Sequence, residues 1–260
     1  PLFRSLRSIA TVSAQVIALL WQLKQFNNAN ELLHFRRGIF RLKRKIVFDS
    51  LAIGMSPFLM NLAACLIVIL INQGLKKYGG DLAIGAFGIV NRLVFIVVMI
   101  VMGLNQGMQP IAGYNFGAKL YDRVNKVLKL TIIYATCVTT FGFLVGMLAP
   151  NLVVGIFTSD AELTELSATG LRITVMFFPI IGFQMVTSNF FQSIGMAGKA
   201  IFLSLTRQML ILLPCLLILP HFFGVAGVWY SMPVSDLLAS LIALVMLVYQ
   251  FRKFKTAAAH

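Results

Sequence analysis

The chain has 260 residues, of which 59% are hydrophobic and only 12% are charged, and its mean hydropathy is +0.88. A soluble domain must coat itself with polar groups, so this composition excludes the soluble class. The net charge of +14 does not indicate a nucleic-acid partner, because most of the Lys and Arg residues lie in short segments between apolar runs. We therefore predict an all-α polytopic membrane protein.

The apolar runs have the length of membrane-spanning helices, which need about 20 mostly apolar residues. A short run at 9–23 predicts a partial transmembrane helix within residues 1–23. Residues 24–49 predict a basic cytoplasmic linker with an amphipathic helix on the membrane surface. A six-helix transmembrane lobe over 50–252 follows, with spans at 50–74, 83–109, 127–149, 168–191, 200–220 and 226–250.

Two features of the chain ends suggest a piece of a longer protein. The N-terminus lacks a Met and an h-region, and the cytoplasmic tail 253–260 ends in TAAAH, which resembles a cloning remnant. We expect the chain to be a fragment that contains one lobe.

The distribution of basic residues predicts the orientation. The 24–49 linker, the 110–126 loop, the 192–199 loop and the C-terminal tail hold most of them, with Arg207 counted beside Lys199. The 150–167 loop holds no Lys or Arg and has three acids. Since cytoplasmic loops carry the excess of Lys and Arg, the basic segments are predicted to lie inside the cell. We expect a multi-pass protein of the cell membrane, and specifically of a bacterial inner membrane.

Prolines interrupt four of the predicted spans. Each removes a backbone donor and bends its helix, which membrane helices tolerate where neighbours or cavity water satisfy the freed carbonyl. The bends suit a protein that opens and closes, and packing kinks are the alternative. The predicted kinks are at Pro57, Pro179, Pro214 and Pro233.

The second full span ends in the stretch GLNQGMQPIAGYNFGAK. No strand precedes it and it has no Lys-Ser/Thr pair, so a phosphate-binding loop is excluded. Gly103 and Gly107 have the spacing that lets two helices approach closely. Pro110 cannot donate to the helix ladder, and Gly113 and Gly117 predict a flexible turn into the basic loop. We interpret the stretch as a hinge and packing corner.

One acidic residue, Asp236, lies well inside a predicted span, and Arg92 is its basic counterpart. Each lies about ten residues from the outer end of its span, or roughly 15 Å deep. A lone charge at that depth is costly, so we expect the two side chains to pair. Two roles stay open, because Asp236 can belong to a structural ion pair or take part in coupling to a proton or cation.

Carboxamide side chains in the spans are more frequent than charges. They predict either a cavity for amphipathic organic cations or hydrogen bonds between helices. The candidates are Asn61, Asn91, Asn105, Gln106, Gln109, Gln184, Asn189 and Gln192. The three Cys and three His residues show no ligand spacing, and no convergent set of acids and bases is present, so we expect no metal, no cofactor and no enzyme.

Three motifs resemble one family. GLNQGMQPIAGYNFGAKLYDRV lies at 103–124, FQSIGMAGKA with LSLTRQMLILLPCLLILP at 191–220, and GVAGVWYSMPVSDLLA at 224–239. In order and spacing they are similar to the C-terminal half of the multidrug and toxic compound extrusion (MATE) transporters, over about residues 9 to 252. The resemblance implies that the short N-terminal piece is the end of helix 6, the linker joins two lobes, and the six spans are helices 7 to 12.

The resemblance also implies a function and a partner. The family exports organic cations and drugs against Na⁺ or H⁺, by rocking of two lobes around a central cavity, so a missing N-terminal lobe is the implied partner beside membrane lipid. Some members place coupling carboxylates in helices 7 and 10, where this chain has no acid. The coupling carboxylate is then expected upstream of this chain, with Asp236 as the reserve candidate.

Two alternatives stay open. A lipid-linked oligosaccharide flippase of the same superfamily tends to line its cavity with several basic residues, whereas only Arg92 is predicted to lie deep in this chain. The other alternative is a truncated membrane protein that does not transport.

Overall fold

The computed structural model describes residues 2–28 and 43–258, and the regular structure within these ranges is entirely helical. The all-α fold predicted from composition is confirmed. The chain divides into two compact units, Pro1–Gly54 and Met55–His260.

The first unit contains α1, Leu2–Phe26, and the beginning of α2, Arg44–Gly117. The apolar run 9–23 lies within α1. This helix is not among the described helices that are long and apolar enough to cross a membrane. Residues 29–42 lie outside the described part of the chain, and with them lies most of the predicted basic linker and its amphipathic helix.

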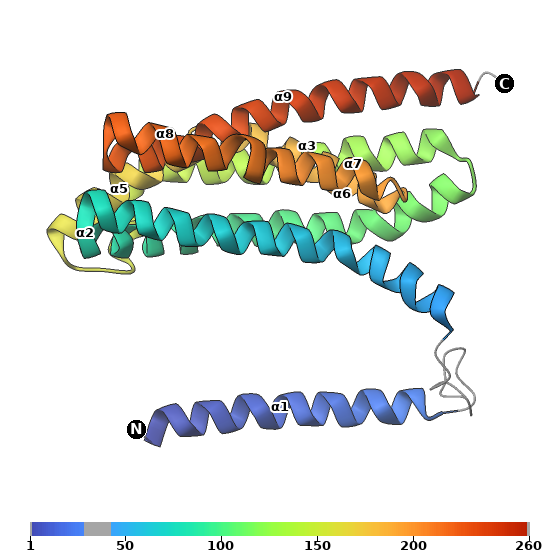
Figure 1. The fold of residues 1–260 in the computed structure, drawn as a ribbon, viewed down its shortest axis with the longest axis horizontal. Helices are drawn as coiled ribbons and strands as arrows, with labels where there is room; N and C mark the ends of the chain where they lie inside the picture. Colours follow the sequence, from blue (N-terminus) through green and yellow to red (C-terminus); the bar gives the residue numbers. More distant parts are fainter. Residues whose placement is uncertain (1, 29–42, 259–260) are drawn as a thin grey trace. The chain divides into compact units, whose positions relative to one another are not determined.

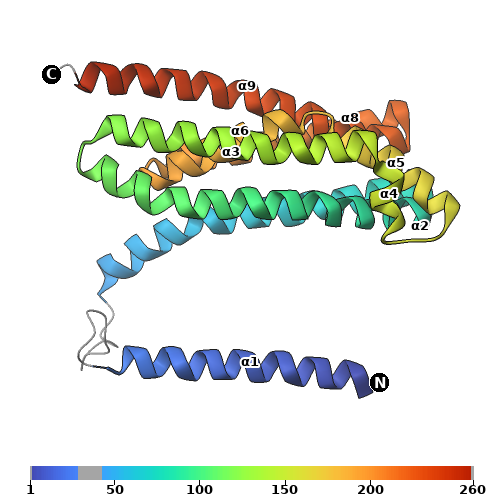
Figure 2. The same ribbon diagram turned by 180° about the vertical axis from the view of Figure 1, so that it is seen from behind.

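The helix α2 consists of two arms that meet at Gly80. The backbone of Gly80 has φ 66° and ψ −161°, a combination that is open essentially to glycine alone. Figures 1 and 2 both show the arm before Gly80 lying beside the arm that follows it. The first two full spans are therefore joined by a one-residue break in the helix, where the sequence predicted a loop over 75–82.

The other helices of the second unit form a bundle with the arms of α2 (Figures 1 and 2). In chain order they are α3 Tyr121–Leu148, α4 Pro150–Gly155, α5 Ala161–Val175, α6 Phe178–Ser193, α7 Ala197–Leu205, the π-helix η1 Thr206–Leu212, α8 Leu213–Phe223 and α9 Val225–Ala258.

The described helices include four or five segments that could cross a membrane by length and composition. Four described segments are long and apolar enough to cross a membrane, and α5 with α6 makes a fifth if that bent pair is one span. One of the four, Phe58–Gly117, has 60 residues, or about 90 Å of helix, which is far more than the ~30 Å hydrocarbon core requires. The two arms of α2 meet at Gly80, so this one helix covers both of the predicted spans 50–74 and 83–109, and the count of six spans stays a prediction.

Two of the prolines lie where one helical segment ends and the next begins. Pro179 is in the first turn of α6, directly after a 55° bend from α5, and Pro214 is in the first turn of α8, directly after η1. Proline fits the first turn because its missing N–H has no partner there in any case. Pro233 lies inside α9, and the helix continues past it. Pro57 lies in α2, and its side chain is not among those that the structure describes.

The glycines of the 103–119 stretch differ from the prediction. Within the described residues, a methyl group added at Gly103 or Gly107 would meet nothing within 4 Å, so no described helix of this chain makes the predicted close approach at these two positions. The close approach occurs at Gly113, where an added Cβ would lie 3.0 Å from the carbonyl oxygen of Ser193 on α6. The turn predicted from Gly113 begins later, because α2 remains helical through Pro110 to Gly117.

The helix α6 lies between two clusters of buried side chains. Its first half places Phe178 in a cluster that also contains Leu75 and Trp229. Its second half places Phe190 in a cluster that also contains Met108. The helix α6 therefore contributes buried side chains to both hydrophobic clusters of the lobe.

Candidate functional site

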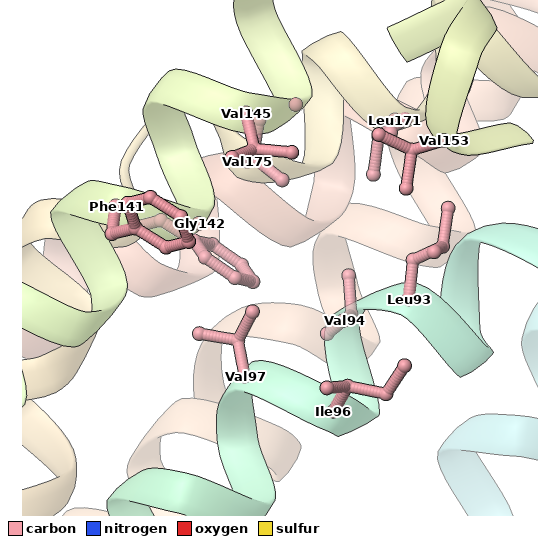
Figure 3. Close-up of a pocket in the computed structure, with 12 residues that line it drawn as sticks. Leu93, Val94, Ile96, Val97, Phe141, Gly142, Val145, Val153, Leu171 and Val175 are labelled. Carbon is pink, nitrogen blue, oxygen red and sulfur yellow. The ribbon is translucent and has the colours of Figure 1, made fainter. Parts of the chain in front are cut away.

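One pocket of the second unit is entirely apolar. It has a volume of about 170 Å³ and lies between the second arm of α2, α3, α4 and the helices α5 and α6 (Figure 3). Its walls include Val97, Phe141, Gly142 and Leu171, and no polar side chain lines it. It presents neither a charge nor a side-chain hydrogen-bonding group, so it could contact a ligand only through apolar side chains.

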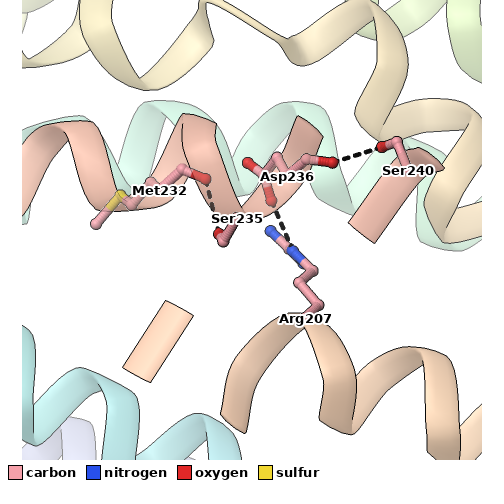
Figure 4. Close-up of polar contacts among 5 residues, drawn as sticks. All are labelled: Arg207, Met232, Ser235, Asp236 and Ser240. Carbon is pink, nitrogen blue, oxygen red and sulfur yellow. Dashed lines mark hydrogen bonds and ion pairs between the residues drawn. The ribbon is translucent and has the colours of Figure 1, made fainter. Parts of the chain in front are cut away.

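The buried charge of α9 is paired with an arginine of η1. The Nε–H of Arg207 donates to the Oδ1 atom of Asp236 across 2.7 Å, as Figure 4 shows. The Asp236 side chain is 5% exposed and the Arg207 side chain 33% exposed. A buried carboxylate requires such a partner, because desolvating a lone charge is expensive.

The predicted pairing of Asp236 with Arg92 is wrong. Arg92 lies exposed on α2, while α9 packs against η1 and directs Asp236 toward Arg207. Equal depth along two helices is not sufficient for contact, because the rotation of each helix decides which side chains face each other.

The serines near Asp236 bond to their own helix. Ser235 Oγ–H donates to the carbonyl oxygen of Met232 at 2.7 Å, and Ser240 Oγ–H donates to the backbone carbonyl of Asp236 at 2.6 Å (Figure 4). Neither hydroxyl therefore reaches the carboxylate. Within the described ranges, Arg207 is the side chain that donates to it.

Arg207 lies on the π-helical segment of its span. In η1 the N–H of Leu213 donates to the carbonyl of Gln208, five residues earlier. Such a turn holds one residue more than an α-turn, which redirects the side chains, and π-segments occur frequently at functional sites. Arg207 lies inside the apolar segment Ala197–Phe223, in agreement with the span predicted at 200–220, although it was counted with Lys199 in the charge distribution.

Arg207 lines two neighbouring pockets. The ion-pair pocket, of about 220 Å³, is lined by Arg207, Asp236, Asn91 and mostly apolar side chains of α2, α6 and α9. The amide pocket, also of about 220 Å³, is lined by Arg207 as well. Met185 of α6 lines both pockets together with Arg207.

The amide pocket combines amides, hydroxyls and thioethers. Its wall comes from both arms of α2, from α6, from α7 and from η1. Beside Arg207, its lining side chains are the amides Gln184, Asn189, Gln192 and Gln208, the hydroxyls Ser188 and Ser204, and the thioethers Met60, Met102 and Met185.

The predicted amides of α2 gather next to this pocket. Asn105, Gln106 and Gln109 line a recess with Met102 of the same helix and Asn189 of α6. Since Met102 and Asn189 also line the amide pocket, the recess and the pocket adjoin. The structure thus brings most of the predicted amides into one region.

Several buried polar atoms in this region have no partner within the described part of the chain. Both amide atoms of Asn105, which is 2% exposed, are unpaired, as are Gln208 Oε1 and Thr206 Oγ1. Asn189 differs, because its Nδ2–H donates to the carbonyl of Met185 at 2.9 Å. Unpaired buried polar groups are rare in folded proteins, so these atoms mark a place for an outside partner or water.

Two predicted amides lie elsewhere. Asn61 is exposed on α2 and lines neither the amide pocket nor the recess, and Asn91 lines the ion-pair pocket. The site residues that sequence reasoning missed are Arg207, Gln208, Ser188 and Ser204. Arg207 had a usable signal, because an ionisable residue in an apolar run is a functional candidate by default.

No group of three or more His, Cys, Asp or Glu side chains that could hold a metal ion is found in the ranges 2–28 and 43–258. The side chains that line the ion-pair pocket, the amide pocket and the recess supply hydrogen-bonding groups, one ion pair and apolar surface.

Comparison with known proteins places this arrangement in a family. The family model described as MatE matches residues 52–218, which is more than half of the chain. The chain belongs to the MATE family. The matched region contains the amide pocket in full, including α6, α7 and η1.

Curated relatives of this MATE chain are named as exporters. It is 26% identical over 249 residues to the multidrug export protein MepA of Staphylococcus haemolyticus and 23% identical over 245 residues to MepA of Staphylococcus saprophyticus. Each match covers 94% of this chain and 53% of the relative, so the chain spans about half the length of the curated relatives it matches.

Solved structures share the fold. The MATE multidrug transporter DinF-BH, solved as a ligand complex, is 36% identical with a TM-score of 0.81, and the match covers 95% of this chain and 55% of that one. An outward-facing MATE transporter of the MOP superfamily, at 20% identity and a TM-score of 0.83, shows the same fold over 95% of this chain and 56% of that one. The protein is accordingly a multi-pass membrane protein.

Proposed function

We propose that the protein is one lobe of a secondary active multidrug exporter, which moves organic cations or drugs out of the cell against Na⁺ or H⁺. The observation that carries the proposal is the amide pocket in a MATE lobe. A few polar groups among flexible thioethers suit amphipathic molecules of varied shape, because polar groups orient the ligand and methionine adapts to it. The names of the MepA and DinF-BH relatives support the same class.

The proposal includes a second lobe as partner. The chain spans about half the length of its relatives, and the amide pocket and recess are lined from this half alone. In transporters built from two repeats, the substrate site lies between the repeats and one repeat rocks against the other. We propose that an N-terminal lobe supplies the opposite wall, in a bacterial inner membrane.

In this proposal, the coupling ion is bound by a carboxylate. The predicted spans 50–74 and 168–191 contain no acid, while α9 contains Asp236 beside the pockets. Two positions are therefore open for the coupling group, a carboxylate of the N-terminal lobe and Asp236. Replacing Asp236 by Asn in the assembled transporter distinguishes them, because only a coupling role for Asp236 would make transport independent of the ion gradient.

The test of the proposed function is dye binding and dye transport in proteoliposomes. The chain alone should bind a fluorescent organic cation saturably and should not move it across the bilayer under a Na⁺ or H⁺ gradient, because half of the cavity wall is supplied by the other lobe. A Gln184→Leu/Asn189→Leu variant serves as the binding control. Absence of saturable binding would contradict the drug-binding function, and vectorial export by the chain alone would contradict the one-lobe proposal.

The flippase alternative has less support. Such a cavity is expected to present several basic residues to a lipid-linked phosphate, whereas Arg207 is the one basic residue among those that line the ion-pair pocket, the amide pocket and the recess. Saturable binding of a lipid diphosphate without binding of organic cations would favour the flippase.

A further inference from the structure

The inference concerns the exposed face of α3. Figure 1 shows this helix behind α6, and Figure 2 shows it in front of α6. Residues three or four positions apart share one face of a helix. This face, the α3 stripe, consists of the exposed side chains of Arg123, Lys126, Leu130, Ile133, Cys137 and Phe141. Val124, Leu128 and Ala135 lie on the opposite face, in a buried cluster, so the α3 stripe is an outer surface of the described lobe.

The α3 stripe changes from cationic to apolar along its length. Arg123 and Lys126 lie at the end of the lobe that the basic residues predict to be inside the cell, and the side chains that follow are apolar. The apolar part from Leu130 to Phe141 rises about 16 Å along the helix, which is close to half of the ~30 Å hydrocarbon core. The stripe therefore has the order and the length of one phospholipid, with the charge first and the hydrocarbon after it.

The cationic end holds more positive charge than its surroundings compensate. Lys119 precedes the α3 stripe and Lys129 flanks it, while Asp122 is the one acid among these residues. All five ionisable side chains from 119 to 129 are exposed, and none of them forms an ion pair within the described part of the chain. Four cations and one acid leave three positive charges for a partner outside the described residues.

Lys199 on α7 shows the contrast. Its Nζ donates to Oε1 of Gln250 and lies 5.3 Å from the centre of the Phe191 ring. Gln250 and Phe191 are both buried, so this lysine is held by the bundle itself. The cations of the α3 stripe have no such contacts among the described residues and remain available to an external anion.

We propose that the α3 stripe binds an anionic phospholipid, with the phosphate beside Arg123 and Lys126 and an acyl chain along the apolar part from Leu130 to Phe141. A free anion would leave the exposed apolar side chains uncovered, and a zwitterionic lipid would leave the positive charge uncompensated. Attraction between exposed charges extends over about 8 Å at physiological ionic strength, so it needs the cations to be near the phosphate and requires no fixed hydrogen bond.

The α3 stripe does not belong to the face proposed for the second lobe. No residue of α3 lines the amide pocket or the recess. A lipid on the stripe and a second lobe over the amide pocket therefore use different surfaces. The inference is independent of the proposed function, because lipid binding and dye binding are measured separately.

The test compares two lipids that differ only in the headgroup. Phosphatidylglycerol, which is anionic, and phosphatidylcholine, which is zwitterionic, are used with the same acyl chains. Binding of each to the 260-residue chain is titrated by native mass spectrometry from detergent micelles. Each Lys or Arg near an anionic lipid surface contributes about a fivefold preference, so the two cations of the stripe predict about 25-fold tighter binding of phosphatidylglycerol.

Three results of this titration would overturn the inference. Equal affinities for the two lipids would contradict a headgroup site. Displacement of phosphatidylglycerol by an equal concentration of glycerol 3-phosphate would show a site for a free anion. Release of a dimer without bound lipid would show that a second copy of the chain covers the stripe.

Variants locate the preference on α3. The double variant Arg123→Gln/Lys126→Gln should lower the ratio of the two affinities by about 25-fold, with phosphatidylcholine binding changed less than about twofold. The variant Asp122→Asn removes the neighbouring acid and should raise the ratio about fivefold. It also provides the test if the double variant does not fold. A ratio that neither change moves would overturn the inference.

The matched control is Lys76→Gln/Lys77→Gln, which removes the same number of exposed positive charges from the first arm of α2, near its break at Gly80. This variant should leave the ratio within about twofold of that of the unmodified chain. An equal loss of preference in the control would show that the net charge of the chain sets the preference, and it would overturn the site on α3.

Discussion

The apolar pocket and the amide pocket lie in the same lobe and are built by overlapping sets of helices, yet only the amide pocket is lined by polar side chains. Helices α2 and α6 line both. The apolar pocket is lined only by hydrocarbon side chains and glycine, whereas the amide pocket has four amides, two hydroxyls and an arginine. The difference shows that the shape of a cavity alone does not mark a binding site in a membrane protein. Apolar side chains cover most of such a protein, so an apolar cavity is not distinctive. Polar groups that the fold leaves without partners are the more informative sign.

The largest expected effect tests the ion pair that borders the amide pocket. The single variant Arg207→Met leaves the Asp236 carboxylate buried and unpaired, so the free energy of unfolding should fall by about 3–5 kcal/mol. Adding Asp236→Leu should restore most of it, because the buried charge is gone. Reversible unfolding in mixed micelles measures both values. A double variant that is as unstable as the sum of the two single variants would contradict a direct pairing.

The next effect concerns an amide at the edge of the same region. Asn105 is buried and neither of its amide atoms has a partner within the described residues, so Asn105→Leu should raise the free energy of unfolding by about 1–3 kcal/mol. The same change should weaken dye binding if a ligand or its water satisfies this amide. Asn61→Leu, on the exposed side of α2, is the control. Lower stability of Asn105→Leu would show that the amide has a stabilising partner in the folded lobe.

The smallest effect tests the apolar pocket. A Cβ at Gly142 would lie 2.9 Å from a methyl group of Val97, so Gly142→Ala should lower the free energy of unfolding by about 1 kcal/mol, the low end for overpacking, because the pocket beside Val97 lets its side chain move. Dye binding should remain within about twofold of the unmodified chain. Gly103→Ala, where an added methyl meets nothing within 4 Å, is the matched control. A large loss of dye binding in Gly142→Ala would contradict the difference between the two pockets.

Sequence reasoning predicted the family and the helical class of the lobe well, but it predicted poorly which side chains contact each other within the lobe. Apolar runs of spanning length predicted a helical membrane protein, which the structure confirms with four or five spans, since the hydrocarbon thickness sets how many apolar residues a span needs. The motif at 103–124 indicated the family that the match over 52–218 confirms. The predicted pairing with Arg92 was wrong because depth along a helix says nothing about the direction of a side chain around it.

Arg207 illustrates the same limit from another direction. Its place within the predicted span 200–220 was correct, but the π-segment that directs its side chain has no clear pattern in the residues TRQMLIL. Gly103 and Gly107 had the spacing of a packing motif, but the face they occupy is open, and the close contact falls on Gly113. Spacing shows which residues share a face, and only the neighbouring helices show which face is covered.

By itself, the sequence determined that this protein is a helical membrane protein with a basic net charge and a MATE pattern, because hydrophobic length and local motifs are properties of consecutive residues. The tertiary structure alone decided that Asp236 meets Arg207, that the amides of α2 and α6 converge, and that Arg207 borders a pocket without an acid. These facts depend on how each helix is rotated about its axis. That rotation is set by the packing of all helices together, which no single segment of the sequence contains.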